Sequence, residues 1–97
     1  MAKGYLVVCY REILDPQKLR TYAELAPKAM LPRGAKILAR DGRVEAFEDG
    51  LAERTILVEF PSYKEAVEAY HSPEYQAAVA ALGDGAVRDF RIVEGVN

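Results

Sequence analysis

Five side chains of this sequence stand out as candidates for transferring a proton or binding a polar ligand. His71 is the lone histidine, and because imidazole titrates near neutral pH it is a candidate general base. Glu59 is a second candidate for moving a proton. Guanidinium and phenol groups donate hydrogen bonds to ligand oxygens, and the candidate ligand-binding residues are Arg40, Arg54 and Tyr75.

Each of these residues also has a structural interpretation. His71 stands directly before a predicted helix break, where the dipole of the preceding helix favours a histidine. Arg40 and Glu59 could form an ion pair across a dimer interface or lie at a solvated strand end. Arg54 could be a surface residue at the start of a strand, and Tyr75 could pack in the core with its hydroxyl paired. The residue types leave both interpretations open.

The sequence predicts neither a metal site nor a cofactor. Cys9 is the only cysteine, which excludes an intrachain disulfide and a thiolate zinc cluster. One histidine, together with carboxylates that lack suitable spacing, makes no other metal site. Gly83-Asp84-Gly85 follows a predicted helix instead of a strand, which is the wrong context for a phosphate-binding loop.

Composition predicts a small globular protein that does not bind nucleic acid. The chain has 97 residues, 51% of them hydrophobic, and a formal net charge of −2. That length predicts one domain over residues 1–97. Scattered basic residues predict no nucleic-acid partner. Because no stretch resembles a signal peptide or a membrane span, we expect a cytoplasmic protein without a membrane partner.

The elements that must position these residues begin with a strand and a helix. Residues 4–13 predict a central strand, because apolar side chains occupy both its odd and its even positions. Both faces of such a strand should be covered. Asp15 and Pro16 predict the start of a helix, with the Asp15 side chain as its cap. Pro27 predicts a kink or a fresh short turn, because its ring removes a backbone donor and clashes with the preceding turn.

Two further strands are expected in the middle of the chain. Residues 35–40 predict the second strand. Asp41-Gly42 is the signal of a two-residue hairpin, with a short return strand over residues 43–48. Residues 54–60 predict the third main strand, whose alternation gives one core face and one mixed face.

The last part of the chain predicts a helix in two pieces and a final strand. Ser62 and Glu65 form a Ser-x-x-Glu capping box for the first piece. Ser72-Pro73 breaks the helix and caps the second piece. Gly83 is a natural C-terminal stop, and residues 87–94 predict the final strand.

The order strand, helix, strand, strand, helix, strand predicts an α+β fold of the ferredoxin-like βαββαβ type. Right-handed crossovers place both helices on one face of an antiparallel sheet. The opposite face is too apolar to face water, so we expect a homodimer packed through it. Its predicted members are Tyr5, Val7, Cys9, Leu38, Arg40, Leu57, Glu59 and Val93.

Four segments carry a family likeness: Gly4-Tyr5, Arg54 to Ser62, Ser72 to Gln76 and Val93-Glu94-Gly95. Together they resemble the domain-of-unknown-function 1330 family, and the resemblance covers essentially the whole chain. It implies membership of the dimeric α+β barrel superfamily. Relatives there include cofactor-free monooxygenases, muconolactone isomerase-like enzymes and ligand-sensing regulatory domains.

The resemblance implies a dimeric barrel that binds a small molecule. We expect cofactor-free, monooxygenase- or isomerase-like chemistry on a small hydrophobic carbonyl or phenolic compound. Arg40 would stabilise a developing oxyanion, and His71 or Glu59 would move the proton. The alternative is a non-catalytic binding or stress-related module. The sequence departs from the family pattern at Leu82, where an arginine is frequent, and at Arg33, where an aromatic residue or histidine is frequent.

Overall fold

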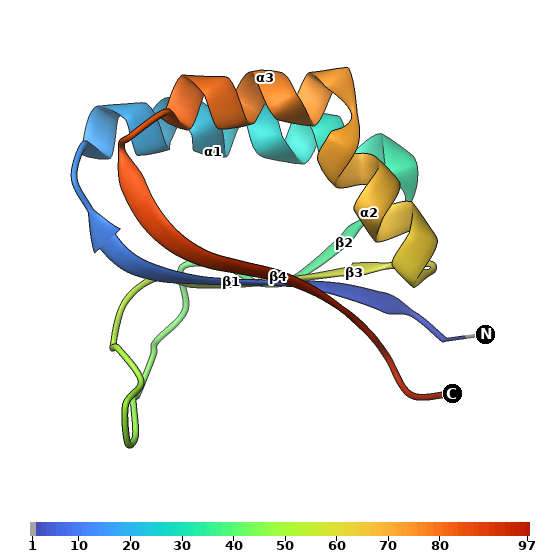
Figure 1. Ribbon diagram of the computed structural model, residues 1–97, viewed down its shortest axis with the longest axis horizontal. Coiled ribbons are helices and arrows are strands. Elements are labelled where there is room, and N and C mark those ends of the chain that lie inside the picture. Colours follow the sequence, from blue (N-terminus) through green and yellow to red (C-terminus); the bar gives the residue numbers. More distant parts are fainter. Residues whose placement is uncertain (1) are drawn as a thin grey trace.

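The computed structural model describes residues 2–97, which build a four-stranded antiparallel sheet with helices on one face (Figure 1). The strands lie in the order β2-β3-β1-β4. This is the ferredoxin-like α+β arrangement predicted from the sequence. We call the sheet face opposite the helices the uncovered face. The strands are β1 (Gly4–Ile13), β2 (Lys36–Ala39), β3 (Thr55–Phe60) and β4 (Ala86–Glu94), and the helices are α1 (Pro16–Met30), α2 (Tyr63–His71) and α3 (Pro73–Leu82).

β1 is the central strand that its apolar run predicts. It pairs with β3 along one edge and with β4 along the other. Leu6, Val8 and Tyr10 face the helices and are each 2% exposed, whereas the residues between them lie on the uncovered face. Burial of Leu6 and Val8 stabilises the fold by about 1.5–3 kcal/mol each.

Each helix begins at a side-chain cap that the sequence predicts. The Asp15 carboxylate accepts hydrogen bonds from two backbone N–H groups in the first turn of α1, at 3.0 and 3.2 Å. The Ser62 hydroxyl accepts one from the backbone N–H of Glu65 at 3.1 Å, and the Ser72 hydroxyl caps α3 in the same way. These donors have no partner inside the helix, so each cap contributes about 1 kcal/mol.

Pro27 does not end α1, so the fresh turn predicted at that residue does not begin there. The helix continues to Met30 and then tightens into a 3₁₀ turn at Leu31–Arg33. Ala29 and Met30 are buried in the core. Their packing offsets the hydrogen bond that the proline removes, because most helix stability in proteins comes from tertiary contacts.

The tight hairpin predicted at Asp41-Gly42 does not form, and residues 43–48 make no strand. β2 pairs with β3 instead. The intervening residues form a long loop, here loop 40–54, which extends beyond the uncovered face (Figure 1). The turn signal of Asp41-Gly42 depends only on neighbouring residues. Pairing with the mostly apolar β3 stabilises β2 more than a tight hairpin with residues 43–48 would. A turn forms later in the loop, where the Gly50 N–H donates to the Phe47 carbonyl at 2.9 Å.

A bulge in β2 places Arg40 on the face opposite to the one predicted. The pairing of β2 with β3 shifts register between Ile37 and Ala39. One extra residue reverses the alternation of every residue that follows it. Arg40 was predicted to share the uncovered face with Leu38, but it lines a cavity on the helix side.

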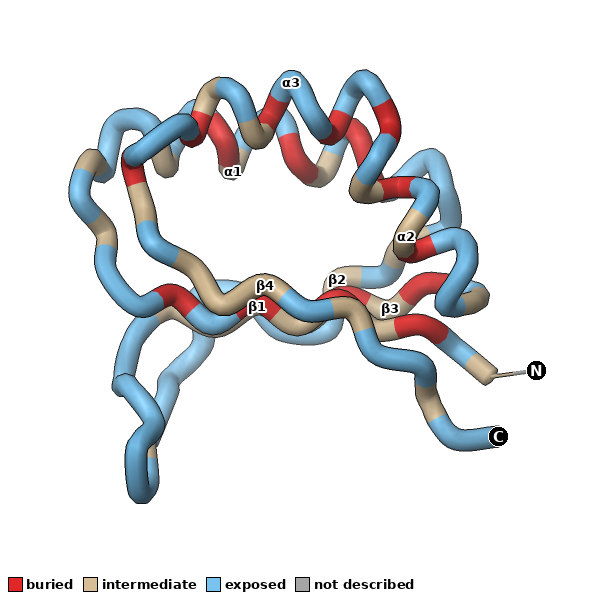
Figure 2. Tube along the Cα trace, viewed as in Figure 1, coloured by how far each residue is buried: buried red, intermediate tan, exposed pale blue. Residues whose placement is uncertain are grey.

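The hydrophobic core lies between the sheet and the helices (Figure 2). Phe60, Ala66, Tyr75 and Ala78 are each 0% exposed. The small alanines let α2 and α3 approach the sheet closely, and the large rings fill the space between the layers. α3 therefore buries one face, which carries Tyr75, Ala78 and Leu82.

Candidate functional site

A small cavity of about 40 Å³ lies between α1 and the helix side of the sheet, and we call it the arginine cavity. Its walls are mainly apolar side chains from β1, β2, β3 and α1. Sites for drug-sized ligands measure about 300–1,000 Å³, so this cavity has room for only a small group. Its polar and aromatic lining residues are Tyr10, Tyr22, Arg40, Arg54 and Arg88.

The ends of three strands bring the arginines together. Arg40 directly follows β2, Arg54 directly precedes β3, and Arg88 lies near the start of β4. In an antiparallel sheet the end of one strand lies beside the start of its neighbour, so these positions meet at one end of the sheet. Tyr10 marks the same end, because it pairs with Arg88 and its N–H donates to the Arg54 carbonyl at 3.0 Å.

Arg88 is held by aromatic rings. Its guanidinium carbon lies 4.7 Å from the ring centroid of Tyr22, 5.1 Å from that of Phe90 and 5.7 Å from that of Tyr10. A cation over a ring face is stabilised by roughly 0.5–2 kcal/mol. These rings fix the guanidinium in place, yet its Nη1 atom is buried and has no hydrogen-bond partner within residues 2–97.

Arg54 carries a second unsatisfied donor. One of its terminal nitrogens pairs with the Asp41 carboxylate, and its guanidinium carbon lies 5.6 Å from the centroid of the Tyr10 ring. Its Nε is buried and has no partner in the described part of the chain. Because an unpaired buried donor costs on the order of 1–3 kcal/mol, this end of the cavity is suited to bind an acceptor oxygen.

Tyr10 and Tyr75 supply no negative charge to this region. Burial raises the pKa of the Tyr75 hydroxyl, which also shares a hydrogen bond of 2.5 Å with the hydroxyl of Tyr22. Burial raises the pKa of Tyr10 as well. A raised phenol pKa keeps the group protonated at neutral pH, so both tyrosines act as neutral O–H groups.

The structure brings two of the five predicted site residues into the arginine cavity. Arg40 and Arg54 line it. Tyr75 packs in the core at 0% exposure, and its hydroxyl reaches the cavity only through Tyr22. These surroundings match the structural interpretation of Tyr75, which is a packed ring with a paired hydroxyl.

Glu59 and His71 lie away from the cavity. Glu59 is on the uncovered face, where its carboxylate accepts a hydrogen bond of 3.3 Å from the Tyr5 hydroxyl. The bulge in β2 therefore separates it from Arg40, and the expected shared pocket does not form. His71 is the exposed last residue of α2, with its ring 5.2 Å from that of Tyr70. Its role as a general base stays a prediction.

Arg88 is the cavity residue that the sequence reasoning missed. In β4 it shares its parity with Phe90 and Ile92, both of which pack against the core. An arginine at a core-facing position of a strand needs a partner, which can be a carboxylate, aromatic rings or a ligand. The place of Arg88 on the core-facing side of its strand is therefore the sequence feature that could have identified it.

Neither a metal-binding cluster nor a membrane-spanning helix is found within residues 2–97. No group of three or more His, Cys, Asp or Glu side chains in this range is placed to hold a metal ion. None of its helices is long and apolar enough to cross a membrane.

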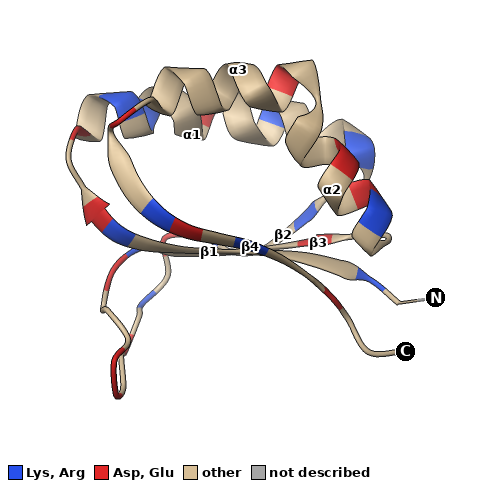
Figure 3. Ribbon diagram, in the orientation of Figure 1, with Lys and Arg blue, Asp and Glu red and all other residues tan. Residues whose placement is uncertain are grey.

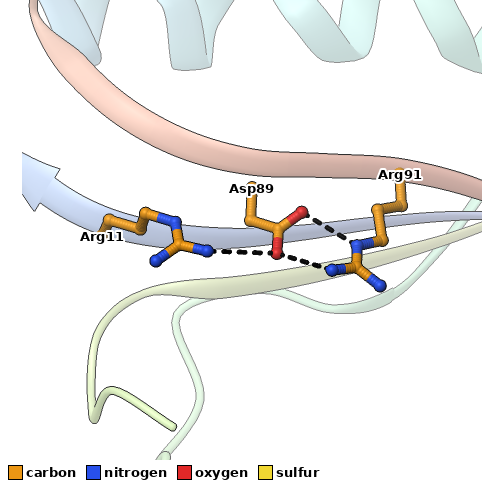
Figure 4. Close-up of polar contacts among 3 residues, drawn as sticks. All are labelled: Arg11, Asp89 and Arg91. Atoms are coloured by element: carbon orange, nitrogen blue, oxygen red, sulfur yellow. Dashed lines mark hydrogen bonds and ion pairs between the residues drawn. The ribbon is translucent and has the colours of Figure 1, made fainter. Parts of the chain in front are cut away.

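A charged cluster lies on the uncovered face. Asp89 lies between Arg11 and Arg91 (Figure 4), with carboxylate oxygens 3.6 Å from Arg11 Nη2 and 2.9 Å from Arg91 Nε. The hydrogen bonds from Arg91 lower the pKa of Asp89. Both signs of charge are therefore present on this face of the sheet.

Loop 40–54 lies next to this cluster. Acidic residues lie at the far end of the loop (Figure 3). Between the loop and the uncovered face is a hollow of about 450 Å³, lined in part by Cys9, Asp89 and Phe47. The Phe47 side chain is 71% exposed and that of Leu51 is 52% exposed. Apolar groups on this side of the molecule thus remain open to contact.

Three solved structures show the same fold at low sequence identity. RPA0582, a protein of unknown function from Rhodopseudomonas palustris, has a TM-score of 0.72 at 19% identity over 96% of this chain and 80% of its own. A dimeric ferredoxin-like protein of unknown function from Thermobifida fusca has a TM-score of 0.59 at 12% identity, over 99% and 92%. A candidate antibiotic biosynthesis monooxygenase from Nitrosomonas europaea has 0.57 at 12%, over 98% and 90%. These similarities establish the fold.

The family likeness of the sequence is confirmed by a family model. A search of curated proteins gives no significant match. The model of a domain of unknown function, DUF1330, matches residues 3–96 and so includes all four segments that carry the resemblance. This chain belongs to the DUF1330 family.

Proposed function

We propose that this protein binds a small apolar compound in the arginine cavity, with an oxygen of the compound on Arg54 and Arg88. The observation that carries the proposal is the pair of buried, unsatisfied guanidinium nitrogens at the end of an apolar cavity. Buried polar atoms are rarely left unpaired, and a ligand oxygen beside either nitrogen would supply the missing acceptor. The apolar walls would hold the rest of the compound.

The size of the cavity limits the ligand. A volume of about 40 Å³ accepts a carbonyl or phenol oxygen and the few atoms attached to it. Ala26, Pro27 and Met30 of α1 form part of the wall, so a larger compound would require α1 to move away from the sheet. We therefore expect compounds with only a few non-hydrogen atoms, and a ring compound would need α1 to move.

A cofactor-free reaction of monooxygenase or isomerase type is the second candidate function. Guanidinium groups at a ligand oxygen stabilise the negative charge that develops when a neighbouring proton is removed. The monooxygenase description of the Nitrosomonas europaea protein favours this chemistry. His71 and Glu59 do not line the cavity, whereas Tyr10 and Tyr22 do. Binding is the function that this geometry supports best.

The opposing candidate is a module that binds no ligand. The small volume of the cavity favours it, because a packed interior leaves little room for a substrate. In that case Arg88 serves only to stack on its neighbouring rings. Ligand binding separates the two proposals.

A thermal melting assay with small phenols, lactones and keto acids tests the proposal. A compound that binds only the folded state raises the melting temperature. We expect at least one to do so for the wild type and for Arg20→Met, a matched control at an exposed arginine of α1. Arg88→Met should abolish the shift. No shift in the wild type would favour the non-binding module, and an equal shift in Arg88→Met would place the compound elsewhere.

We also propose that two copies pair through the uncovered face. Its exposed apolar groups include Val93, which is 53% exposed, and Phe47 of loop 40–54 lies on the same side at 71%. Apolar patches of this kind are usually covered by a partner. The dimeric Thermobifida fusca protein shows that this fold pairs in a relative.

Sedimentation at micromolar concentration tests the pairing. We expect about twice the chain mass of 10.8 kDa. Leu57→Asp should give monomers, because a carboxylate buried in the interface is costly. Leu25→Asp, on the exposed side of α1, is the control and should stay dimeric. A wild-type monomer would contradict the proposal.

A further inference from the structure

We infer that the arginine cavity selects a small carboxylate anion over neutral carbonyl and phenolic compounds. The inference rests on the proposed binding function and goes beyond it by assigning the charge and shape of the polar end of the ligand. Charge balance, donor geometry and cavity size all point to this class.

The cavity carries an excess of positive charge. Arg40, Arg54 and Arg88 line it, and none of its lining residues in the described chain is acidic. Guanidinium groups stay protonated in proteins. The one carboxylate paired with these arginines, that of Asp41, is 62% exposed and lies outside the lining. Solvent screens the charge of the exposed Arg40, but the half-buried Arg88 has no carboxylate among the lining residues, and an anion beside it would supply the opposite charge.

The neighbouring tyrosines do not balance this charge. Tyr10 and Tyr75 stay protonated because burial raises the pKa of each. A neutral ketone or phenol would accept a hydrogen bond but would leave the charge uncompensated. A carboxylate accepts the hydrogen bond and also supplies the opposite charge. Hydrogen bonds between ionised partners are about twice as strong as neutral ones.

Two guanidinium nitrogens near the cavity are buried without an acceptor within residues 2–97. Arg88 offers Nη1 and Arg54 offers Nε, and both guanidiniums lie within 5.7 Å of the centroid of the Tyr10 ring. A carboxylate has two oxygens and can accept from one guanidinium in a bidentate geometry, whereas a carbonyl has one oxygen. The rings around Arg88 already hold it in place, so little conformational entropy is lost on binding.

The volume and the apolar walls set the rest of the ligand. Ile37, Ile56 and Met30 line the cavity beyond the arginines, and they favour an aliphatic or aromatic body over a second charged group. About 40 Å³ suits a short body. Butyrate is therefore a suitable probe and benzoate tests the upper size limit, and their neutral amides, butyramide and benzamide, are nearly isosteric controls.

Calorimetric titration and melting shifts with these four compounds and with inorganic phosphate, at constant ionic strength, test the inference. We expect butyrate or benzoate to bind the wild type, and the amides and phosphate to bind at least 10-fold more weakly. Arg88→Met should weaken carboxylate binding about 10- to 100-fold. Arg88→Lys keeps the charge but loses the planar fork, so its loss should be intermediate. Arg20→Met should bind like the wild type.

The possible outcomes separate the inference from the proposal on which it rests. Equal binding of acid and amide would overturn the carboxylate class and leave the binding function standing. Phosphate binding as tight as that of butyrate would overturn it as well, because charge alone would then suffice. No response to these probes or to the earlier panel would overturn the binding function itself. If circular dichroism shows that Arg88→Met is unfolded, Arg54→Met removes the second unsatisfied nitrogen and takes its place.

Discussion

Removing one hydroxyl of the Tyr22–Tyr75 pair should destabilise the protein more than removing both. The two hydroxyl oxygens lie 2.5 Å apart, and the side chains are 7% and 0% exposed. Tyr22→Phe leaves the Tyr75 hydroxyl in the core without this partner. The double substitution Tyr22→Phe/Tyr75→Phe removes both polar groups and keeps both rings.

The magnitudes follow from where each remaining hydroxyl lies. An unpaired buried hydroxyl costs about 1–3 kcal/mol, so Tyr22→Phe should lose about 2 kcal/mol. Tyr75→Phe should lose about 1 kcal/mol, because Tyr22 lines a cavity that is large enough to admit a water molecule. The free energy of unfolding of the double variant should stay close to that of the wild type, since two matched apolar groups replace a hydrogen-bonded pair. The expected coupling free energy is therefore about 2–3 kcal/mol.

Urea unfolding followed by far-ultraviolet circular dichroism, at one protein concentration, gives the free energies of all four proteins. In a domain of this size 1 kcal/mol corresponds to about 4–8 °C in Tm, so Tyr22→Phe should melt several degrees below the double variant. Unchanged m values would show that the unfolded states are comparable. If the two single losses simply add in the double variant, the hydroxyls do not interact and the reasoning is refuted.

Three other changes test the packing and the charges. Ser62→Ala should cost about 1 kcal/mol in a denaturant melt because α2 loses its cap, and an unchanged melt would mean that the cap does not form. Gly4→Ala would place a Cβ 2.5 Å from the Ser62 carbonyl oxygen and should cost about 1–3 kcal/mol. Gly42→Ala, with nothing within 4 Å, is its control, and equal melts for the two would contradict the close approach. The pKa of Asp89 is lowered by hydrogen bonds from Arg91, so its contribution to stability is present above about pH 4 and is lost as the pH falls through its folded pKa. Asp89→Asn should flatten this part of the stability profile, and an unaltered acid limb would argue against the pairing.

Much of the fold was readable from the sequence because the signals are local. Asp15, Ser62 and Ser72 cap helices through donors only a few residues away, so their spacing is sufficient to predict them. The alternation within residues 54–60 predicts which face is buried for the same reason. From the order of these elements the ferredoxin-like topology follows.

The candidate site depended on tertiary structure because each of its parts rests on a partner far along the chain. Arg40 faces the cavity only because β2 pairs with β3 through a bulge, and no residue near Arg40 encodes that register shift. Pro27 stays helical because residues after it are buried by distant elements. Arg88 could be read as a core-facing arginine, but it and Arg54 reach the same Tyr10 ring only because β1 lies between β3 and β4. The residues themselves determined which side chains could bind an anion, and the pairing of strands decided which of them meet.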